Sequence, residues 1–258
     1  MKNFVDENSI VRTIWQQTDT VLFIFGGAAA EFALNKAVDW LYFTGKLPQD
    51  PIGRLFSTVG YAQKIIFEDE DKVLQTLKAI KTIHQNVEIK RGYAIPDWAY
   101  RDVLFMLIYY SIASFELLER PLTTAEKEEI FTVFGRVGVE LGLVDLPENY
   151  DNWLVAREQH LNQNLAYSLF TKDLYQQYQK QLGTGRYEAL VEIQKLLVPR
   201  QVYALLQFSK QKRYRPVIAN YKYIKNNRFV IALKLKLLPK KYIQQLNAMN
   251  RQTASPNH

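Results

Sequence analysis

The chain has 258 residues, 48% hydrophobic and 23% charged, a composition typical of a folded globular protein that excludes a disordered chain. It has no cysteine and three histidines, His84, His160 and His258, which excludes disulfides, thiolate metal sites and any site built from several histidines. The net charge of +7 is uneven. Residues 183–258 carry fifteen basic and two acidic residues, a net charge of +13, which leaves −6 for residues 1–182. Such a basic segment either forms solvated helix faces or contacts an anionic partner.

No targeting or membrane-spanning segment is evident in the first part of the chain. The N-terminus has acidic residues where a signal peptide needs positive charge. The most apolar run, residues 21–30, stops at Glu31, about half the length that a bilayer-spanning helix requires. The Gly26-Gly27 pair within it indicates close helix packing. We expect a cytoplasmic protein, soluble or peripherally attached to a membrane.

Apolar periodicity predicts helices through the middle of the chain. Asp50-Pro51 is typical of a helix start, with the Asp as the cap and the Pro in the first turn. Residues 71–87 place His84 on one apolar stripe with Leu77, Ile80 and Val87. Residues 103–118 are apolar nearly all round, as in a central helix. Thr123 and Glu126 have the spacing of a capping box and predict a helix to about Leu141, ending near Gly142.

The rest of the chain also has helical patterns. We expect helix over 150–182, a break at 183–185, shorter amphipathic helices over 186–197 and 199–208, helix over 228–238, and a frayed tail at 251–258. The prediction is one all-α domain, with an acidic helical core (1–182) and a basic helical C-terminal part (183–258).

Several short motifs occur in a fixed order. They read DPxGRLxxT from Asp50, IHxxV around His84, GYAxxD from Gly92, PLT from Pro121, then Gly142 and Leu146-Pro147. In this order the set resembles the family of mpaB-type oxygenases and the rubber oxygenase (latex-clearing protein) catalytic domain, over roughly residues 15–245.

The resemblance implies an all-α domain that encloses one b-type haem. It implies that His84 is the proximal iron ligand and that Arg54 and Thr58, from the RLxxT motif, lie near the haem. It also implies an enzyme that uses O2 to cleave an apolar unsaturated substrate, such as an isoprenoid chain, at a carbon–carbon double bond.

The residues themselves are compatible with these roles and with simpler ones. A haem iron held by one neutral imidazole keeps its opposite position open for O2, so a single histidine is sufficient. The simpler interpretation of His84 is a core histidine bonded to a carbonyl. Arg54 could neutralise a haem propionate, donate to bound oxygen or pair with Asp50. Thr58 could bond near the haem or to its own helix backbone.

The sequence departs from the family pattern at three places. Ser57 stands where some relatives have a lysine beside the RLxxT threonine, 33–35 read Ala-Leu-Asn where many have an AHP segment, and 104–110 lack a further histidine. His160 lies in a polar stretch, which favours a surface position. Trp98 and Tyr110 are pocket candidates, although aromatic residues are more often plain core.

The leading hypothesis is a haem-dependent oxygenase whose partners are an apolar small molecule, O2 and, through the basic C-terminal part, an anionic membrane. The alternative is a non-catalytic haem- or lipid-binding helical protein that docks on an anionic surface. Nucleic-acid binding through residues 213–225, where basic and aromatic residues alternate, is the least favoured because no recognised motif accompanies them. No sequence feature indicates an oligomeric state.

Overall fold

The computed structural model describes residues 2–45, 49–210, 216 and 220–224. Within these ranges the chain is all-α, as predicted, with two isolated β-bridges, Asn3–Asp69 and Asn35–Leu165. The helices are α1 (Ile10–Trp15), α2 (Thr18–Phe32), α3 (Asp39–Phe43), α5 (Pro51–Phe67), α6 (Glu70–Arg91), α7 (Asp97–Leu118), α8 (Thr124–Leu141), α9 (Tyr150–Gln163), α10 (Leu169–Leu182), α11 (Thr184–Leu197), α12 (Arg200–Leu205) and α14 (Tyr221–Ile224).

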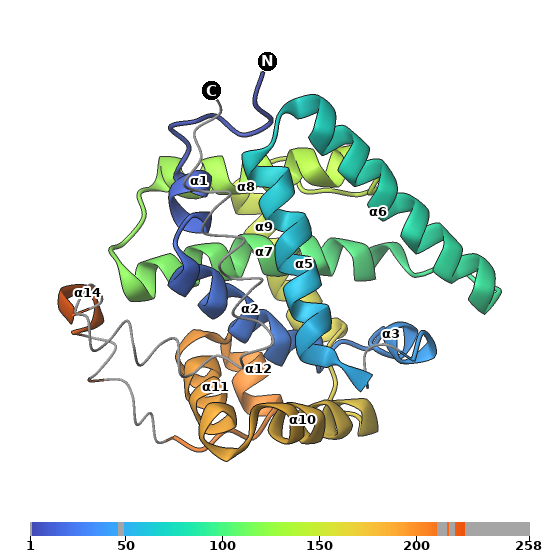
Figure 1. Cartoon of the computed structure of the whole chain (residues 1–258), viewed down its shortest axis with the longest axis vertical. Helices are drawn as coiled ribbons and strands as arrows, with labels where there is room; N and C mark the ends of the chain where they lie inside the picture. The colour runs from blue at the N-terminus through green and yellow to red at the C-terminus, as the bar shows by residue number, and fades with distance from the viewer. Residues whose placement is uncertain (1, 46–48, 211–215, 217–219, 225–258) are drawn as a thin grey trace.

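Helix α7 lies across the middle of the molecule (Figure 1). It packs most extensively against α2 and also contacts α1, α8 and α11, which explains why its sequence is apolar nearly all round. Helix α5 crosses in front of it, and α6 runs along an outer side, packed against α5 and α8 (Figure 1). Among the described residues, no helix combines the length and apolar composition that a membrane span requires.

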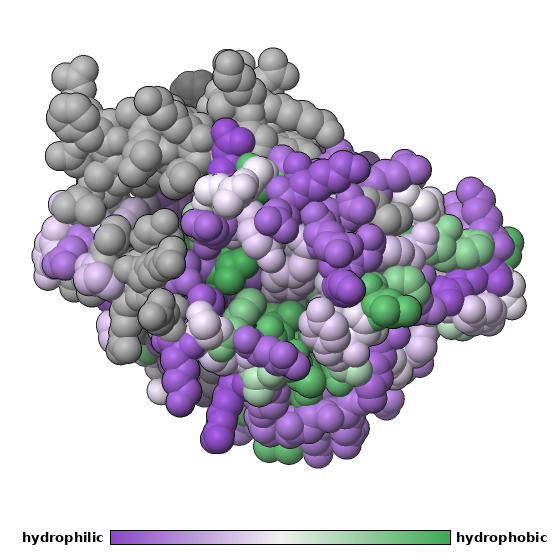
Figure 2. All heavy atoms as spheres, turned by 90° about the horizontal axis from the view of Figure 1, so that it is seen from below, coloured by the Kyte–Doolittle hydropathy of each residue, from purple (hydrophilic) through white to green (hydrophobic). Residues whose placement is uncertain are grey.

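The surface is polar with apolar side chains interspersed. Figure 2 shows the face seen from below, where hydrophilic residues dominate and hydrophobic groups lie between them. Leu169, at the start of α10, is 84% exposed, and Ile89, near the end of α6, is 76% exposed. Single exposed apolar residues are normal on soluble proteins.

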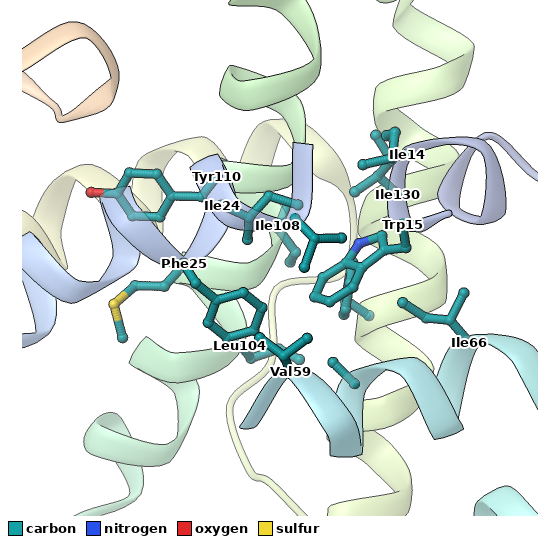
Figure 3. Packing of buried hydrophobic residues seen from close by; sticks show 14 of the residues in the cluster. Ile14, Trp15, Ile24, Phe25, Val59, Ile66, Leu104, Ile108, Tyr110 and Ile130 are labelled. Carbon is teal, nitrogen blue, oxygen red and sulfur yellow. The ribbon is translucent and has the colours of Figure 1, made fainter. Parts of the chain in front are cut away.

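The core is organised around Trp15. Its ring lies 5.9 Å from that of Phe25 and 6.0 Å from that of Phe134, and Figure 3 shows isoleucines from α1, α2 and α7 packed beside it. The indole N–H donates to the Ser111 hydroxyl at 3.1 Å, so its one polar atom is satisfied in the interior. This contact joins α1 to the central helix.

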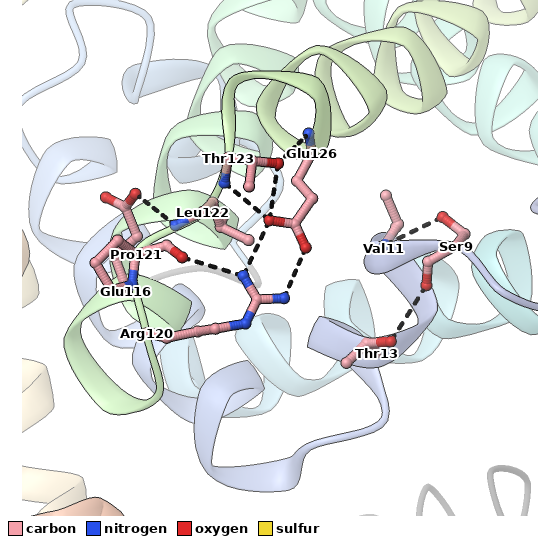
Figure 4. Close-up of polar contacts among 9 residues, drawn as sticks. All are labelled: Ser9, Val11, Thr13, Glu116, Arg120, Pro121, Leu122, Thr123 and Glu126. Carbon is pink, nitrogen blue, oxygen red and sulfur yellow. Dashed lines mark hydrogen bonds and ion pairs between the residues drawn. The ribbon is translucent and has the colours of Figure 1, made fainter.

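Local sequence signals set the helix ends as predicted. Asp50 accepts a hydrogen bond from the Gly53 N–H at 2.9 Å, with Pro51 in the first turn of α5. Thr123 and Glu126 form a reciprocal capping box at the start of α8, and Arg120 reaches the same carboxylate at 2.7 and 2.9 Å (Figure 4). Gly142 ends α8 with a φ of 76°, a conformation that suits glycine.

The second half of the chain differs from expectation at one place. The predicted helix over 150–182 is wrong in one respect, because the chain leaves the helix at Asn164 and starts again after Ser168. In the gap, Leu165 pairs with Asn35 in a β-bridge, and Ser168 forms a capping box with Thr171. The helix expected over 228–238 and the tail 251–258 lie outside the described residues.

Candidate functional site

Arg54 lies in the first turns of α5 with its guanidinium unpaired among the described residues. Its side chain is partly buried, and burial lowers the pKa of Arg54, an effect that Tyr61 partly offsets. Among the described residues no ion pair joins Arg54 to Asp50, the predicted alternative, and the Asp50 carboxylate accepts from the Gly53 N–H at the start of α5. A desolvated cation without a counter-charge is suited to an anionic group brought by a ligand.

His84 lies on α6, close enough to Arg54 for their charges to interact. Burial lowers the pKa of His84, the positive charge of Arg54 lowers it further, and Glu88 partly opposes both. The imidazole is therefore neutral at neutral pH, the form that binds iron. Its ring packs against Tyr100 of α7 at 4.9 Å, and neither ring nitrogen hydrogen-bonds to a described residue. The carbonyl-bonded core histidine of the simpler interpretation is absent there.

The apolar stripe that carries His84 is covered only at its beginning. Val73 and Leu77 are buried, whereas His84 and Val87 are partly exposed and Ile83 is 41% exposed. The expectation that the whole stripe faces the core is therefore correct only for the first two turns of α6. Beyond them, Ile80, His84 and Val87 are only partly buried, with His84 packed against Tyr100.

The far end of α6 is fixed by Arg91. Its guanidinium lies 4.0 Å from the Trp40 ring and 4.7 Å from the Tyr93 ring, and it pairs with Asp39 at 2.5 Å. These contacts join the end of α6 to α3. His84 therefore lies between two anchored ends of the same helix.

The other candidate residues make contacts within the chain. The Thr58 hydroxyl donates to the Arg54 carbonyl at 3.2 Å, the backbone bond named as its alternative. Tyr110 is fully buried against Gly27, and its hydroxyl donates to Glu31 at 3.0 Å, so it is core rather than pocket lining. Trp98 is partly buried, with its ring 6.2 Å from that of His160.

A second polar constellation is buried where α2, α7 and α9 meet. Glu31 and Asp102 are 0% exposed, Arg157 is 3% exposed and His160 is 5% exposed. Arg157 binds both oxygens of Glu31, while Asp102 contacts His160 and accepts a hydrogen bond from Asn35. Burial lowers the pKa of Arg157, but Glu31 more than compensates, so the net shift is upward and the side chain stays charged.

The surface position predicted for His160 is wrong. The residue is on the inner face of α9, together with Trp153, Arg157 and Leu161. The spacing of residues 153, 157, 160 and 161 is that of one helix face, which is a sequence signal for burial. Two of the four residues are polar, so the face does not stand out as apolar. Glu31 and Asp102 are buried as well, although charged side chains usually lie in solvent and no sequence pattern predicts their burial.

Residues 15–213 match the family model described as ER-bound oxygenase mpaB/B'/Rubber oxygenase, catalytic domain, a range that includes Arg54, Thr58 and His84. Searches of curated proteins and of solved structures found no match. The family match covers most of the chain and supports an oxygenase-type function. The chain therefore belongs to the mpaB/rubber oxygenase catalytic domain family.

Proposed function

We propose that this protein is a haem-dependent oxygenase that acts on an apolar unsaturated, isoprenoid-like substrate, with His84 as the iron ligand. The observation that carries the proposal is the pairing of a neutral, unbonded imidazole with an unpaired, desolvated guanidinium on the facing helix. These two groups fit haem b, which needs one neutral nitrogen ligand and a counter-charge for its propionates or its bound gas. When bound, haem supplies the activation of O2.

The chain's own residues have distinct roles in this proposal. His84 would hold the haem iron, and Tyr100 supports the imidazole through a tilted ring contact at 4.9 Å. Arg54 binds an anionic group at the site. Thr58 steadies the first turns of α5 through its backbone bond, which keeps Arg54 in place.

We also propose that residues 1–182 and 183–258 form one domain. Helix α11, which follows Gly183, packs against α2, α7 and α10, and the family match continues across this position. The β-bridge partner Leu165 and Val202 of α12 share a small apolar cluster with Leu34 of the first half. These contacts support a continuous core.

The test is an absorption spectrum of the full chain supplied with haem, with His84→Ala and the control Gln85→Ala compared. We expect a Soret band in the wild type. Gln85→Ala should show the same band, because Gln85 is exposed and lies next to His84 in the sequence. In His84→Ala the Soret band should be lost or shifted. Uptake of O2 with squalene as the unsaturated substrate would then test the oxygenase activity. A band of equal shape and intensity in all three proteins would refute His84 as the ligand.

The alternative function, a non-catalytic binding protein that docks on an anionic surface, has one observation of its own. A depression of about 420 Å³ beside α11 and α12 is lined by Leu196, Val198 and Tyr203 and by three basic residues, Arg200, Lys210 and Lys195, the last of which pairs with Glu192. Such a basic surface attracts anionic lipid. Co-sedimentation with phosphatidylserine vesicles, compared with phosphatidylcholine vesicles, tests it; binding without O2 uptake would favour this function.

A further inference from the structure

The buried constellation at α2, α7 and α9 contains a geometry that the haem proposal does not use. One ligand atom from each of Glu31, Asp102 and His160 lies within 4.8 Å of the other two. The three side chains come from three different helices and converge in the interior. We propose that they form a binding site for one divalent transition-metal ion, separate from the haem site.

The first argument is charge. Glu31 and Asp102 contribute two negative charges, and Arg157 contributes the one permanent positive charge within the described part of this constellation. With a neutral imidazole the group carries a net charge of −1 in a region that water does not reach. An uncompensated buried charge is strongly unfavourable, so either a proton on His160 or a bound cation supplies the further positive charge.

The second argument is that unsatisfied atoms point at this place. Asp102 Oδ1 and His160 Nε2 are buried and in contact, yet neither makes a hydrogen bond of acceptable geometry to a described residue. Two such atoms, one carboxylate oxygen and one imidazole nitrogen, are a suitable pair of ligands for a shared cation. Glu31 keeps a lone pair on Oε1, which accepts one hydrogen bond from Arg157, whereas Oε2 accepts from both Arg157 and Tyr110.

The third argument is the surrounding support. Metal ligands in proteins are usually oriented by hydrogen bonds from a second layer of residues. Arg157 and Tyr110 hold Glu31, Asn35 holds Asp102, and the Asn164 side chain lies 3.1 Å from Nδ1 of His160, which leaves Nε2 for the ion. All three ligands are therefore already fixed.

The donor set indicates the class of ion. One imidazole nitrogen and two carboxylate oxygens suit Mn²⁺, Fe²⁺, Co²⁺ or Zn²⁺, and do not suit Cu⁺, which prefers sulfur ligands. Three protein ligands also leave coordination positions open for water or a small ligand, unlike a closed structural site.

The experiment measures the metal content of the full chain expressed in medium supplemented with Mn²⁺, Co²⁺ and Zn²⁺ and then dialysed. Wild type is compared with Asp102→Asn, His160→Gln and the control His84→Gln. We expect close to one ion per chain in wild type and His84→Gln, and at least tenfold less in the other two. Asp102→Asn keeps the shape of the side chain, so circular dichroism separates loss of metal from loss of fold.

Three results would overturn the proposal. Absence of metal from the wild type would mean that a proton, and not a metal ion, balances the negative charges of Glu31 and Asp102. Metal retained in both Asp102→Asn and His160→Gln would place the ion elsewhere, and metal lost in His84→Gln would assign it to the haem site. Because iron is left out of the supplement and haem is scored separately by its Soret band, failure of this proposal is distinct from failure of the oxygenase proposal.

Discussion

Two adjacent glycines in α2 should respond in opposite ways to the same substitution. A Cβ on Gly27 would lie 2.4 Å from two ring carbons of Tyr110, whereas a Cβ on Gly26 would lie 3.4 Å from the nearest atom, on Ile193. Ordinary contacts begin near 3.4 Å, so Gly27→Ala requires a displacement of about 1 Å between α2 and α7. Gly26→Ala requires none.

The expected cost of Gly27→Ala follows from what holds the Tyr110 ring. Tyr110 is 0% exposed and its hydroxyl is bonded to Glu31 at 3.0 Å, so the ring cannot move without loss of this bond. Overpacking costs about 1–3 kcal/mol and a hydrogen bond to a charged group about 1.5–3 kcal/mol. Alanine returns up to about 1 kcal/mol through helix propensity. The net loss in the free energy of unfolding should be about 1.5–6 kcal/mol.

Urea denaturation followed by circular dichroism measures both variants. Gly26→Ala should match the wild type or exceed it by up to about 1 kcal/mol, because it gains helix propensity without a clash. Equal stability of Gly27→Ala and wild type would refute the close α2–α7 contact as the reason for this glycine. If Gly26→Ala lowered the free energy of unfolding by more than 2 kcal/mol, the open space at Gly26 would be refuted, and Gly26 could not serve as the control for Gly27.

The remaining predictions concern helix ends. Thr123→Ala should lower the free energy of unfolding by about 1 kcal/mol through loss of the α8 cap. Hydrogen bonds from Arg120 and from the Thr123 backbone lower the pKa of Glu126 to about 2, so the stabilisation that Glu126 provides is full above about pH 4.3 and is lost as pH falls toward 2; Glu126→Gln should therefore differ from wild type in urea at pH 6 but hardly at pH 2. Arg91→Ala, but not its exposed neighbour Lys90→Ala, should speed hydrogen exchange at the end of α6 while α7 is unchanged.

Local features of the sequence predicted the fold well. The cap at Asp50, the capping box at Thr123 and the glycine end at Gly142 depend on residues within a few positions of one another, so they can be recognised without a structure. The break at residues 164–168 is also partly local, because Ser168 caps α10 with Thr171. It was missed because the expected capping partner is Glu or Gln rather than Thr.

The buried constellation could not be predicted in the same way. Arg157 and Glu31 are 126 residues apart, and Asn35 and Asp102 are 67 apart. Each of these side chains alone suggests a solvated position, since charged residues are rarely buried unless they are paired. The pairing depends on three helices meeting, which no short window of sequence contains.

The proposed haem site illustrates an intermediate case. The position of His84 on an apolar stripe was predictable, but the extent to which other helices cover that stripe was not. Val73 and Leu77 hold one end of α6 in the core and Arg91 holds the other end on Trp40, while Ile80, His84 and Val87 between them are only partly buried. Apolar side chains that are only partly buried gain free energy from a further apolar surface against them. A flat, largely apolar cofactor ligated by His84 would provide that surface, and its removal should leave α6 anchored but less protected along its middle turns.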